Sequence, residues 1–379
     1  ITFANTLDSI RGSTNNLTLL AGDTITFRGA IGQTQRLGQL SADAANVTTA
    51  TTVAVDRLTV KARDNATLRG NTSVTSGGAI EATNVLLEGD LTAIGGSLDL
   101  QATRSVGIGN ITSNGGNVRI QGNAVAVGAI DSSQPSGTGG AIDLTSSAGA
   151  VIAGSLNASG AIGGNIAVNS SAGISALDLN SSATRGNGGI VSLNAIGNIQ
   201  LGFVNAQGGS NGNGANVDIT TTGLFRSNNV FNDISGNISS ISTVGSTGAG
   251  AIVIRHGGGS DRPFVVGSDS ENGTRGTINA GVGNAILPTI SFLETYTQGS
   301  FPNQISLITQ ASTPIPEPIP EPIPEPIPSP TPAPTNPAVP SFSSSLQVEL
   351  RSPTINRNSP GRPDILAPSR RRLDSATAG

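Results

Sequence analysis

The chain has no cysteine, methionine or tryptophan, and only one tyrosine and one histidine among its 379 residues. The absence of cysteine excludes disulfides, thiolate metal sites and a cysteine nucleophile. Only 12% of the residues are charged and the net charge is −4. This charge is too weak and too acidic for a protein that binds nucleic-acid phosphates through a basic face. No run of about 18 apolar residues occurs, so we expect no transmembrane segment.

A core must therefore form almost without aromatic side chains, which make up 3% of the chain, whereas glycine is abundant at 51 residues. The sequence offers instead a repeated phrase, Gly-Gly-x-h-x-h, in which h is Val, Ile or Leu. Its copies begin at Gly95, Gly115, Gly139, Gly163 and Gly188, with a relaxed copy at Gly214 and a weaker one at Gly77. The starts are roughly 18 to 26 residues apart, which is the period range of solenoids.

Each repeat continues beyond the phrase with two further apolar pieces. Counted from the first glycine, apolar residues recur at +11, +13 and +16, as in Val106, Ile108 and Ile111. A later copy has Ala150 and Ile152 at the first two of these places. The third piece opens with an apolar residue, then Asn, Asp or Thr, then Ala or Ser. Three short pieces per unit, two of them alternating with period 2, predict one coil made of three strands.

Stacking such coils predicts inward aliphatic ladders. One ladder contains Leu98, Val118, Ile142, Ile166, Val191 and Val217, and the next contains Leu100, Ile120, Leu144, Val168, Leu193 and Ile219. Helices are disfavoured because the period is 2 and because Gly, Asn, Ser and Thr separate the apolar positions. Hairpins would need longer strands joined by turns of the Asn-Gly type. We predict an all-β fold, a right-handed, single-stranded parallel β-helix with three sides and roughly 11–14 coils.

The corners of this helix have their own signals. The glycine pair supplies the backbone freedom for a tight corner before each first strand. Length varies just after the third strand, so insertions are expected at that corner. A larger, bulging insertion is expected in the unit that follows Gly214, where the apolar residues are Leu224, Phe225, Val230, Phe231 and Ile234.

We predict five segments along the chain. They are divergent N-terminal coils at 1–76, regular repeats at 77–254, divergent C-terminal coils or a cap at 255–310, a polyproline II linker at 311–340 and a disordered tail at 341–379. The linker follows from the run of alternate prolines, which fix φ and remove hydrogen-bond donors. The chain opens at Ile1 inside a strand-like run without an initiator methionine, so we expect a piece of a longer protein.

The position between the two apolar residues of the phrase faces outward and is the first candidate site. It is occupied by Glu81, Asp99, Arg119, Asp143, Ala167, Ser192 and Asp218. Because neighbouring coils lie about 4.8 Å apart, Asp99, Arg119 and Asp143 should form a charged ladder. One hypothesis is an acid/base cluster of a polysaccharide enzyme, which needs two carboxylates at a set separation. We favour a solvated face of alternating charge, because the column continues into Ala167 and Ser192.

The only histidine, His256, is the second candidate and lies in the sequence RHGGGSDRPF. A hydrolytic triad needs a partnered nucleophile and an orienting acid. Asp261 and several serines are nearby in sequence, but no nucleophile-elbow phrase is present. We therefore interpret His256 as a loop residue at a coil exit.

Two further patterns are given structural or chance interpretations. The calcium-binding nonapeptide of some β-helices is absent, and Asp143 is out of register with it. Asn-x-Ser/Thr triplets are attributed to chance in a chain rich in these residues; they include Asn65, Asn71, Asn157, Asn180 and Asn237. The sequence therefore predicts no catalytic, cofactor-binding or metal-binding residue, and no cofactor.

The repeated units, with TITFRGAIGQTQRLGQLSAD upstream, resemble the filamentous-haemagglutinin-like surface proteins of bacteria. The segments RHGGGSDRPFVVGSDSENGTRGTINAG and TYTQGSFPNQISLITQ, followed by the Pro-Glu-Pro-Ile run, are similar to a cyanobacterial subset. In that subset the β-helix is often followed by a CHAT (caspase-like) peptidase domain. The resemblance covers about residues 1–340. It implies export by a two-partner route through an outer-membrane barrel, and display or release at the cell surface.

Two departures limit what the resemblance implies. The family's amino-terminal secretion domain is not in this chain, and a peptidase dyad of His and Cys is excluded because the chain has no cysteine. Peptidase activity therefore cannot be assigned to any residue here.

Three function hypotheses follow. The first is a secreted or surface-held stalk or adhesin that mediates attachment or display, is not an enzyme within these residues, and has surface carbohydrate or protein ligands. The second is a scaffold or sensor arm of a CHAT-type peptidase protein, with catalysis in a domain that this chain lacks. The third is a carbohydrate-active β-helix enzyme, which predicts a cleft lined by at least two close carboxylates. The gene sequence beyond residue 379 would distinguish the first two.

Overall fold

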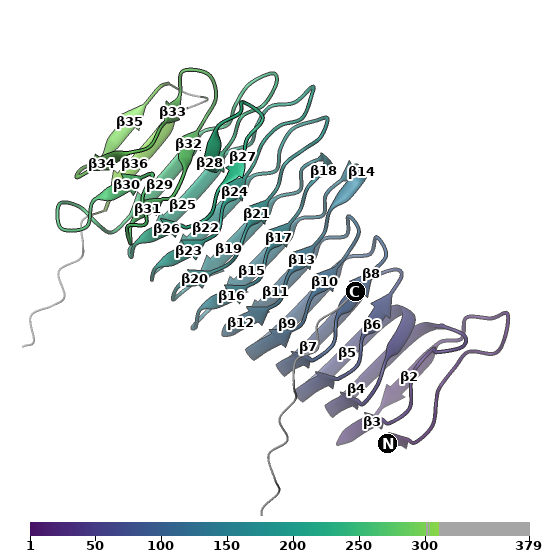
Figure 1. The fold of residues 1–379 in the computed structure, drawn as a ribbon. Coiled ribbons are helices and arrows are strands. Elements are labelled where there is room, and N and C mark those ends of the chain that lie inside the picture. Colours follow the sequence, from purple (N-terminus) through teal and green to yellow (C-terminus); the bar gives the residue numbers. More distant parts are fainter. Residues whose placement is uncertain (301, 303, 311–379) are drawn as a thin grey trace, which may run out of the picture. The chain divides into compact units, whose positions relative to one another are not determined.

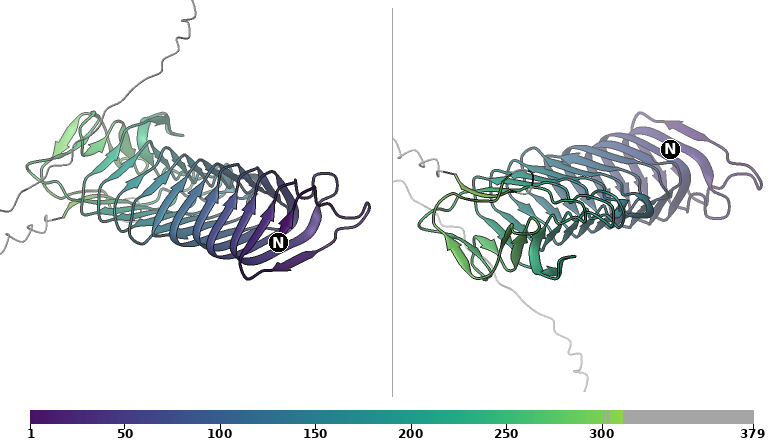
Figure 2. Two further views of the ribbon diagram at one scale, coloured as in Figure 1. Left: turned by 90° about the horizontal axis from the view of Figure 1, so that it is seen from below. Right: turned by 90° about the horizontal axis from the view of Figure 1, so that it is seen from above.

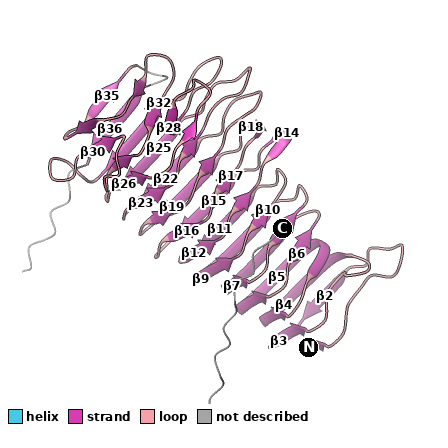
Figure 3. Ribbon diagram, in the orientation of Figure 1, coloured by secondary structure: helices cyan, strands magenta, loops and turns pink. Residues whose placement is uncertain are grey.

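The computed structural model describes residues 1–300, 302 and 304–310, which belong to one compact unit. All regular structure in these residues is β-strand (Figure 3). The predicted polyproline linker at 311–340 and the predicted tail at 341–379 lie outside the described residues. The strands stack as a parallel β-solenoid of about ten turns, so the predicted fold class is confirmed (Figure 1).

Three stacks of parallel strands form three faces. The first face contains β2 (Leu17–Leu20), parts of β4 (Leu37–Thr49), β5 (Val53–Leu68), β7 (Gly78–Leu87) and β9 (Leu98–Ile108), then β11 (Val118–Gly122), β15 (Ile142–Ser146), β19 (Ile166–Ser170), β22 (Val191–Ala195), β25 (Val217–Thr221), β29 (Ile252–His256) and β36 (Ile305–Thr309). The strands β4, β5, β7 and β9 continue round a corner into the second face, with a register shift in β4, β5 and β7 where they bend.

The second and third faces complete each coil. The second face contains β1 (Thr2–Phe3), β3 (Thr24–Phe27), the later parts of the four long strands, β12 (Ala124–Val127), β16 (Val151–Ala153), β20 (Ile174–Ser175), β23 (Ile199–Leu201), β26 (Phe225–Ser227) and β31 (Gly273–Thr274). The third face contains the first part of β5, which pairs with β6 (Thr72–Val74), and then β8 (Leu91–Ala93), β10 (Ile111–Thr112), β13 (Ile130–Asp131), β17 (Leu156–Asn157), β21 (Leu179–Asn180), β24 (Val204–Asn205), β28 (Ile238–Ser242) and β32 (Thr277–Asn279).

The two predicted aliphatic ladders are present on the first face. Leu98, Val118, Ile142, Ile166, Val191 and Val217 lie opposite one another in successive strands, as do Leu100, Ile120, Leu144, Val168, Leu193 and Ile219. Every one of these side chains is at most 2% exposed. Such columns fill a narrow core with branched aliphatic groups, which is how a chain so poor in aromatic residues buries a continuous interior.

One predicted register on the second face is wrong. In the coil that begins at Gly139, the inward residues are Val151 and Ala153, which lie opposite Val125 and Val127. Ile152, which was expected to point inward, is 57% exposed. The corner before β16 holds one more residue than the pattern allowed, and a one-residue slip reverses the facing of every side chain in a strand.

The corners explain why small residues recur there. Ser132 and Ser181, each directly after the outward residue of the third face, are buried and donate 2.7 Å hydrogen bonds to the carbonyl groups of Gly140 and Gly189, the second glycines of the next phrases. A Cβ atom on either glycine would clash with the backbone of the coil before it. The glycine pair is therefore required by the close approach of successive coils, in addition to the turn itself.

The outward residues of the third face also form a ladder. The Asn157 amide donates to Asp131 at 3.0 Å, and the Asn180 amide donates to Asn157 at 3.2 Å. A second amide ladder on the second face joins Asn84 to Asn65 at 3.0 Å. Several of the Asn-x-Ser/Thr triplets thus place their asparagines in inter-coil hydrogen bonds.

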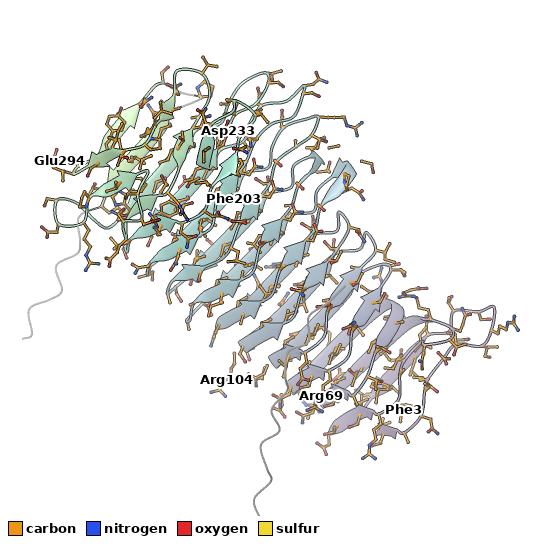
Figure 4. The ribbon with its side chains drawn as sticks, in the orientation of Figure 1. Phe3, Arg69, Arg104, Phe203, Asp233 and Glu294 are labelled. Carbon is orange, nitrogen blue, oxygen red and sulfur yellow. The ribbon has the colours of Figure 1, made fainter. Side chains whose placement is uncertain are left out.

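The insertion expected after Gly214 is a hairpin of β27 (Phe231–Asn232) and β28, which are antiparallel. Phe231 packs against Phe203 on the flank of the solenoid, with ring centroids 4.7 Å apart (Figure 4 labels Phe203). Phe225 is not part of this insertion, contrary to the prediction. It continues the second-face column opposite Ile199 and is fully buried.

The turn of this hairpin contains a buried carboxylate, Asp233 (Figure 4). It accepts hydrogen bonds from the Ser239 hydroxyl at 2.7 Å and the Asn279 amide at 2.6 Å. It also accepts the backbone N–H groups of Ser235 and Asn237, both at 2.9 Å. These donors compensate the carboxylate for its lost hydration and hold the turn of the hairpin to the coil that follows.

Antiparallel strands close the C-terminal end of all three faces. Figure 2 shows this end in green, at the opposite end of the stack from the purple N-terminal coils. On the first face, β35 (Tyr296–Gln298) pairs with β36. On the second face, β34 (Ile290–Phe292) pairs with β30 (Phe264–Val266), and β30 in turn pairs with β31. On the third face, β33 (Ala285–Ile286) pairs with β32. About ten turns are present where roughly 11–14 coils were expected, and the chain after His256 forms mainly these hairpins.

The N-terminal end differs. Among the described strands β1 pairs only with β3 and β2 only with β4. Phe3 and Leu17, the core residues of this first coil, are only partly buried. The stack therefore presents an open strand edge and apolar side chains at this end.

Candidate functional site

The predicted charged column on the first face is present but is not an ion-paired ladder. Asp99, Arg119 and Asp143 lie opposite one another in successive strands. In the part of the chain that the structure describes, Arg119 forms no salt bridge, while Asp99 accepts the Gln101 amide at 3.0 Å. The column then passes through Ala167 and Ser192, as the sequence register predicted.

The predicted place in this column is wrong for Glu81 and correct for Asp218. Glu81 lies opposite Gln101 and Lys61, so it belongs to the neighbouring outward column and not to that of Asp99. The weak copy GGAIEA lies two residues out of register with the other copies, because Ile80 pairs with Leu100 and not with Leu98. Asp218 does belong to the column, and its carboxylate pairs with Arg255 at 2.7 Å.

Glu81 and Lys61 form part of a charged patch on the N-terminal coils. Asp43, Lys61 and Glu81 lie in successive strands, and Arg63 approaches Asp43 at 3.8 Å. The patch surrounds an open depression of about 420 Å³. Its ion pair is half-exposed on both sides, so solvent screens it and it contributes little to stability.

A second depression, of about 510 Å³, lies on the second face. Gly107, which has no side chain, and Ala126, which has a small one, form its floor. The exposed side chains of Leu86 and Ile152 flank them in the same column. The lining is mainly apolar, with amide groups only along one side. This surface has few groups that could orient a ligand.

His256 is not the loop residue that we predicted. It is the last residue of β29 and is 1% exposed, with its ring 5.0 Å from that of Phe264. Its Nδ1 lies 3.2 Å from the side-chain nitrogen of Asn272, which donates to it when the ring proton is on Nε2. Burial lowers the pKa of His256 from 6.5 to about 4, so the ring is neutral at pH 7. Asp261 is exposed and does not serve as its partner.

Asn272 links this histidine to the loop that follows it. Its amide also donates to the carbonyl of Arg262 at 2.9 Å, and its oxygen accepts the backbone N–H of Phe225 at 3.3 Å. One buried amide thus joins β29, β26 and the connection between β29 and β31. That connection is held over the C-terminal end of the second face.

The loop and the second face enclose a polar cleft of about 490 Å³, which we name the C-terminal cleft. Its lining consists of Asn198, Ile199, Gln200, Leu224 and Arg226 from the coils, and Arg262, Asp269, Ser270 and Glu271 from the loop. Gln200 and Arg226 are neighbours in the outward column of the second face. The floor of the cleft is therefore regular solenoid, and its other wall is the overhanging loop.

Arg226 anchors the loop wall of the C-terminal cleft to the solenoid. Arg226 donates to the Ser268 carbonyl at 2.7 Å and to Asp269 at 3.0 Å. Arg275 approaches the same carboxylate at 3.9 Å, and Arg262 approaches Glu271 at 3.6 Å. Burial lowers the pKa of the Arg226 guanidinium, and the charge of Asp269 opposes that shift, so the arginine stays charged.

Sequence reasoning did not identify this cleft. Its residues come from the start of β23, from β26 and from the loop after β29, and no local motif joins them. Two sequence features could have indicated the cleft: the loss of periodicity after His256 and the charged stretch around Asp269. Pairing of β26 with β31 is what brings the two parts together.

No protein-family model, no curated protein and no solved structure matches the chain. The solenoid is compatible with the β-helix of filamentous-haemagglutinin-like proteins, the family that the sequence resembles. Within residues 1–300, 302 and 304–310, no group of three or more His, Asp or Glu is placed to hold a metal ion. Nor does any of the described residues belong to a helix long and apolar enough to cross a membrane.

Proposed function

We propose that the chain is a stalk that mediates attachment at a cell surface, with the C-terminal cleft as its ligand site. The observation that carries this proposal is the contrast between the repeated coils and that cleft. The coils bury most of their apolar residues and repeat the same hydrogen bonds. The cleft instead gathers guanidinium, carboxylate and amide groups between the second face and a loop that Arg226 anchors to it. A recognition function concentrated in one site on a rigid scaffold agrees with this arrangement.

The solenoid has the dimensions of a spacer. About ten turns at about 4.8 Å each give a rod of roughly 50 Å. Each coil is tied to the next on three faces, so a ligand site at one end is held at a fixed distance from the other end. We further propose export by a two-partner route through an outer-membrane barrel and an extracellular location, as the family resemblance implies.

An adhesion assay tests the proposal. The purified chain is coupled to beads, and the beads are incubated with bacterial and eukaryotic cells and with surfaces coated with extracted cell-surface glycans or proteins. We expect retention that free chain inhibits. Beads coated with an unrelated β-solenoid of similar charge provide the control. Equal retention of the two bead types on every surface would remove support for attachment.

A second candidate, a carbohydrate-active enzyme, is favoured by one observation. It requires two close carboxylates in a cleft, and the C-terminal cleft contains Asp269 and Glu271. Both carboxylates are engaged by arginines, which suits binding better than proton transfer. Incubation of polysaccharides with the chain, followed by size analysis of the products, distinguishes the candidates, because only an enzyme shortens them.

A further inference from the structure

The C-terminal cleft has a composition that selects among ligand classes. We propose that it binds a neutral saccharide, and that Gln200, Glu271 and Arg262 recognise its hydroxyl groups. This inference rests on the proposed attachment function and names the class of ligand. The argument uses the balance of charge in the cleft, its unused hydrogen-bonding groups and the rigidity of its walls.

The charges that line the cleft cancel. Two guanidinium groups, of Arg226 and Arg262, face two carboxylates, of Asp269 and Glu271. An anionic ligand would meet both carboxylates and a cationic ligand both arginines, so neither has a clear electrostatic advantage. A sugar hydroxyl donates one hydrogen bond and accepts another, and it can therefore use a carboxylate and a guanidinium or amide at the same time.

Several polar groups of the cleft retain hydrogen-bonding capacity. Within the described residues the Gln200 side chain has no hydrogen-bond partner, although it lies next to the anchored Arg226. The oxygen of Asn198 accepts the backbone N–H of Leu224 at 2.9 Å, which leaves its amide hydrogens for a ligand. Arg262 and Glu271 are largely exposed and paired only loosely, at 3.6 Å, so ligand hydroxyls can insert between them.

The apolar part of the lining is small, which disfavours a peptide ligand. Leu224 is half-buried and Ile199 is buried, and no aromatic ring lines the cleft. Peptide and protein interfaces concentrate their binding energy in aromatic and large apolar anchors that fill pockets. Leu224 instead offers limited contact for the C–H face of a sugar ring. A volume of about 490 Å³ lies in the range of small-ligand sites.

The cleft is formed before any ligand arrives. The pairing of β26 with β31, the bonds of Arg226 to Ser268 and Asp269, and the buried Asn272 fix the loop to the solenoid. Because the main chain of both walls is already held, binding orders only a few side chains and loses less conformational entropy.

The test measures binding of the whole chain to a panel of neutral and acidic oligosaccharides, first on an array and then by calorimetry for those retained. We expect binding of neutral members. Gln200→Ala and Glu271→Gln should each weaken it about tenfold, as expected for loss of one or two hydrogen bonds to the ligand. Asn194→Ala is the matched control, because Asn194 is an exposed amide on the first face of the same coil and should leave affinity unchanged. Thermal unfolding of each variant checks that the fold is retained.

The outcomes separate this inference from the function on which it rests. Adhesion to cells without binding of any saccharide, or saccharide binding that the two cleft variants leave intact, overturns the inference and keeps attachment. Selective binding of acidic members also overturns it. Absence of both adhesion and saccharide binding removes both proposals. Shortening of a bound oligosaccharide contradicts a purely binding role and supports the enzyme.

Discussion

The two ends of the described solenoid differ in how their outermost strands are paired. At the N-terminal end β1 and β2 each have one partner among the described strands, and Phe3 and Leu17 are partly exposed. At the C-terminal end every face finishes with an antiparallel strand, and Phe264 and Leu307 are fully buried. A parallel edge can accept another coil, whereas hairpins reverse the chain and cover the core. The Gly-Gly-x-h-x-h phrase predicts where coils form but does not predict how the stack is closed.

The two ends should differ most in how strongly a core substitution lowers the free energy of unfolding. Phe264→Ala should reduce the free energy of unfolding by about 3–5 kcal/mol, because it leaves a cavity where the ring stacks on that of Phe225. Phe3→Ala should cost roughly 1–2 kcal/mol, because the ring is already partly in water. Denaturant-induced unfolding measures both values. Equal losses would show that the open end is as well packed as the closed one.

Acidification should lower the stability of the C-terminal end. The pKa of His256 is about 4 in the folded chain against about 6.5 when unfolded, so the unfolded chain binds the proton first. The stability that the neutral ring supports is present above pH 6.5 and is lost as the pH falls from 6.5 to 4. The loss should approach about 3 kcal/mol.

Unfolding measured between pH 7 and pH 4 checks this. Asn272 and Phe264 lie against the ring, and the Asn272 amide also donates to the Arg262 carbonyl. The Gln310 N–H donates to the main-chain carbonyl of His256, and the charged side chain of Arg262 is directed to Glu271. His256→Gln should lower stability at neutral pH and flatten the pH dependence. A slope that persists in this variant would assign the effect to other groups.

The coils between the two ends should show a smaller effect at their corners. Ser181→Ala removes the buried hydrogen bond to the Gly189 carbonyl and should cost about 1 kcal/mol. Ala158 and Ala206 occupy the same place in neighbouring coils, which indicates that the hydroxyl is helpful but not essential. Ser192→Ala, on the exposed first face, is the control and should change the free energy of unfolding by less than about 0.5 kcal/mol. A larger loss at Ser192 than at Ser181 would contradict the assignment.

The smallest effect is expected at the exposed ion pairs of the N-terminal coils. Arg69 and Glu88 approach to 3.5 Å with both side chains about half exposed. Arg69→Ala should cost less than about 0.5 kcal/mol, and the loss should diminish further at high salt. Unfolding at two salt concentrations measures this. A loss above 1 kcal/mol would mean that the guanidinium also packs against the coil.

The regular coils could be predicted because one rule determines them. Alternation along a strand fixes which residues face inward, so Ile142 and Leu144 were assigned correctly from the phrase alone. The rule says nothing about the number of residues in a corner. That is why Ile152 was placed inside the core although Val151 is the inward residue. Glu81 was misplaced for a related reason, because a weak copy does not fix its register.

The C-terminal end could be predicted only as an irregular, aromatic-rich region. The sequence predicts a loop position for His256, but the residue is buried against Asn272 and the ring of Phe264. Local periodicity does not reveal these contacts. The C-terminal cleft was missed for the same reason. Gln200 and Glu271 lie far apart in sequence, and only the pairing of β26 with β31 brings their segments together.

The direction of the inter-coil hydrogen bonds has a mechanical consequence. In all three faces these bonds run along the solenoid axis, so tension on a stalk pulls each coil directly away from the next. A coil of about 24 residues occupies about 4.8 Å when folded and spans roughly 80 Å when drawn out. Stretching of a single molecule should therefore give successive extensions of about this length. Such a rod would lengthen coil by coil under load before it transmitted the full force to whatever it holds.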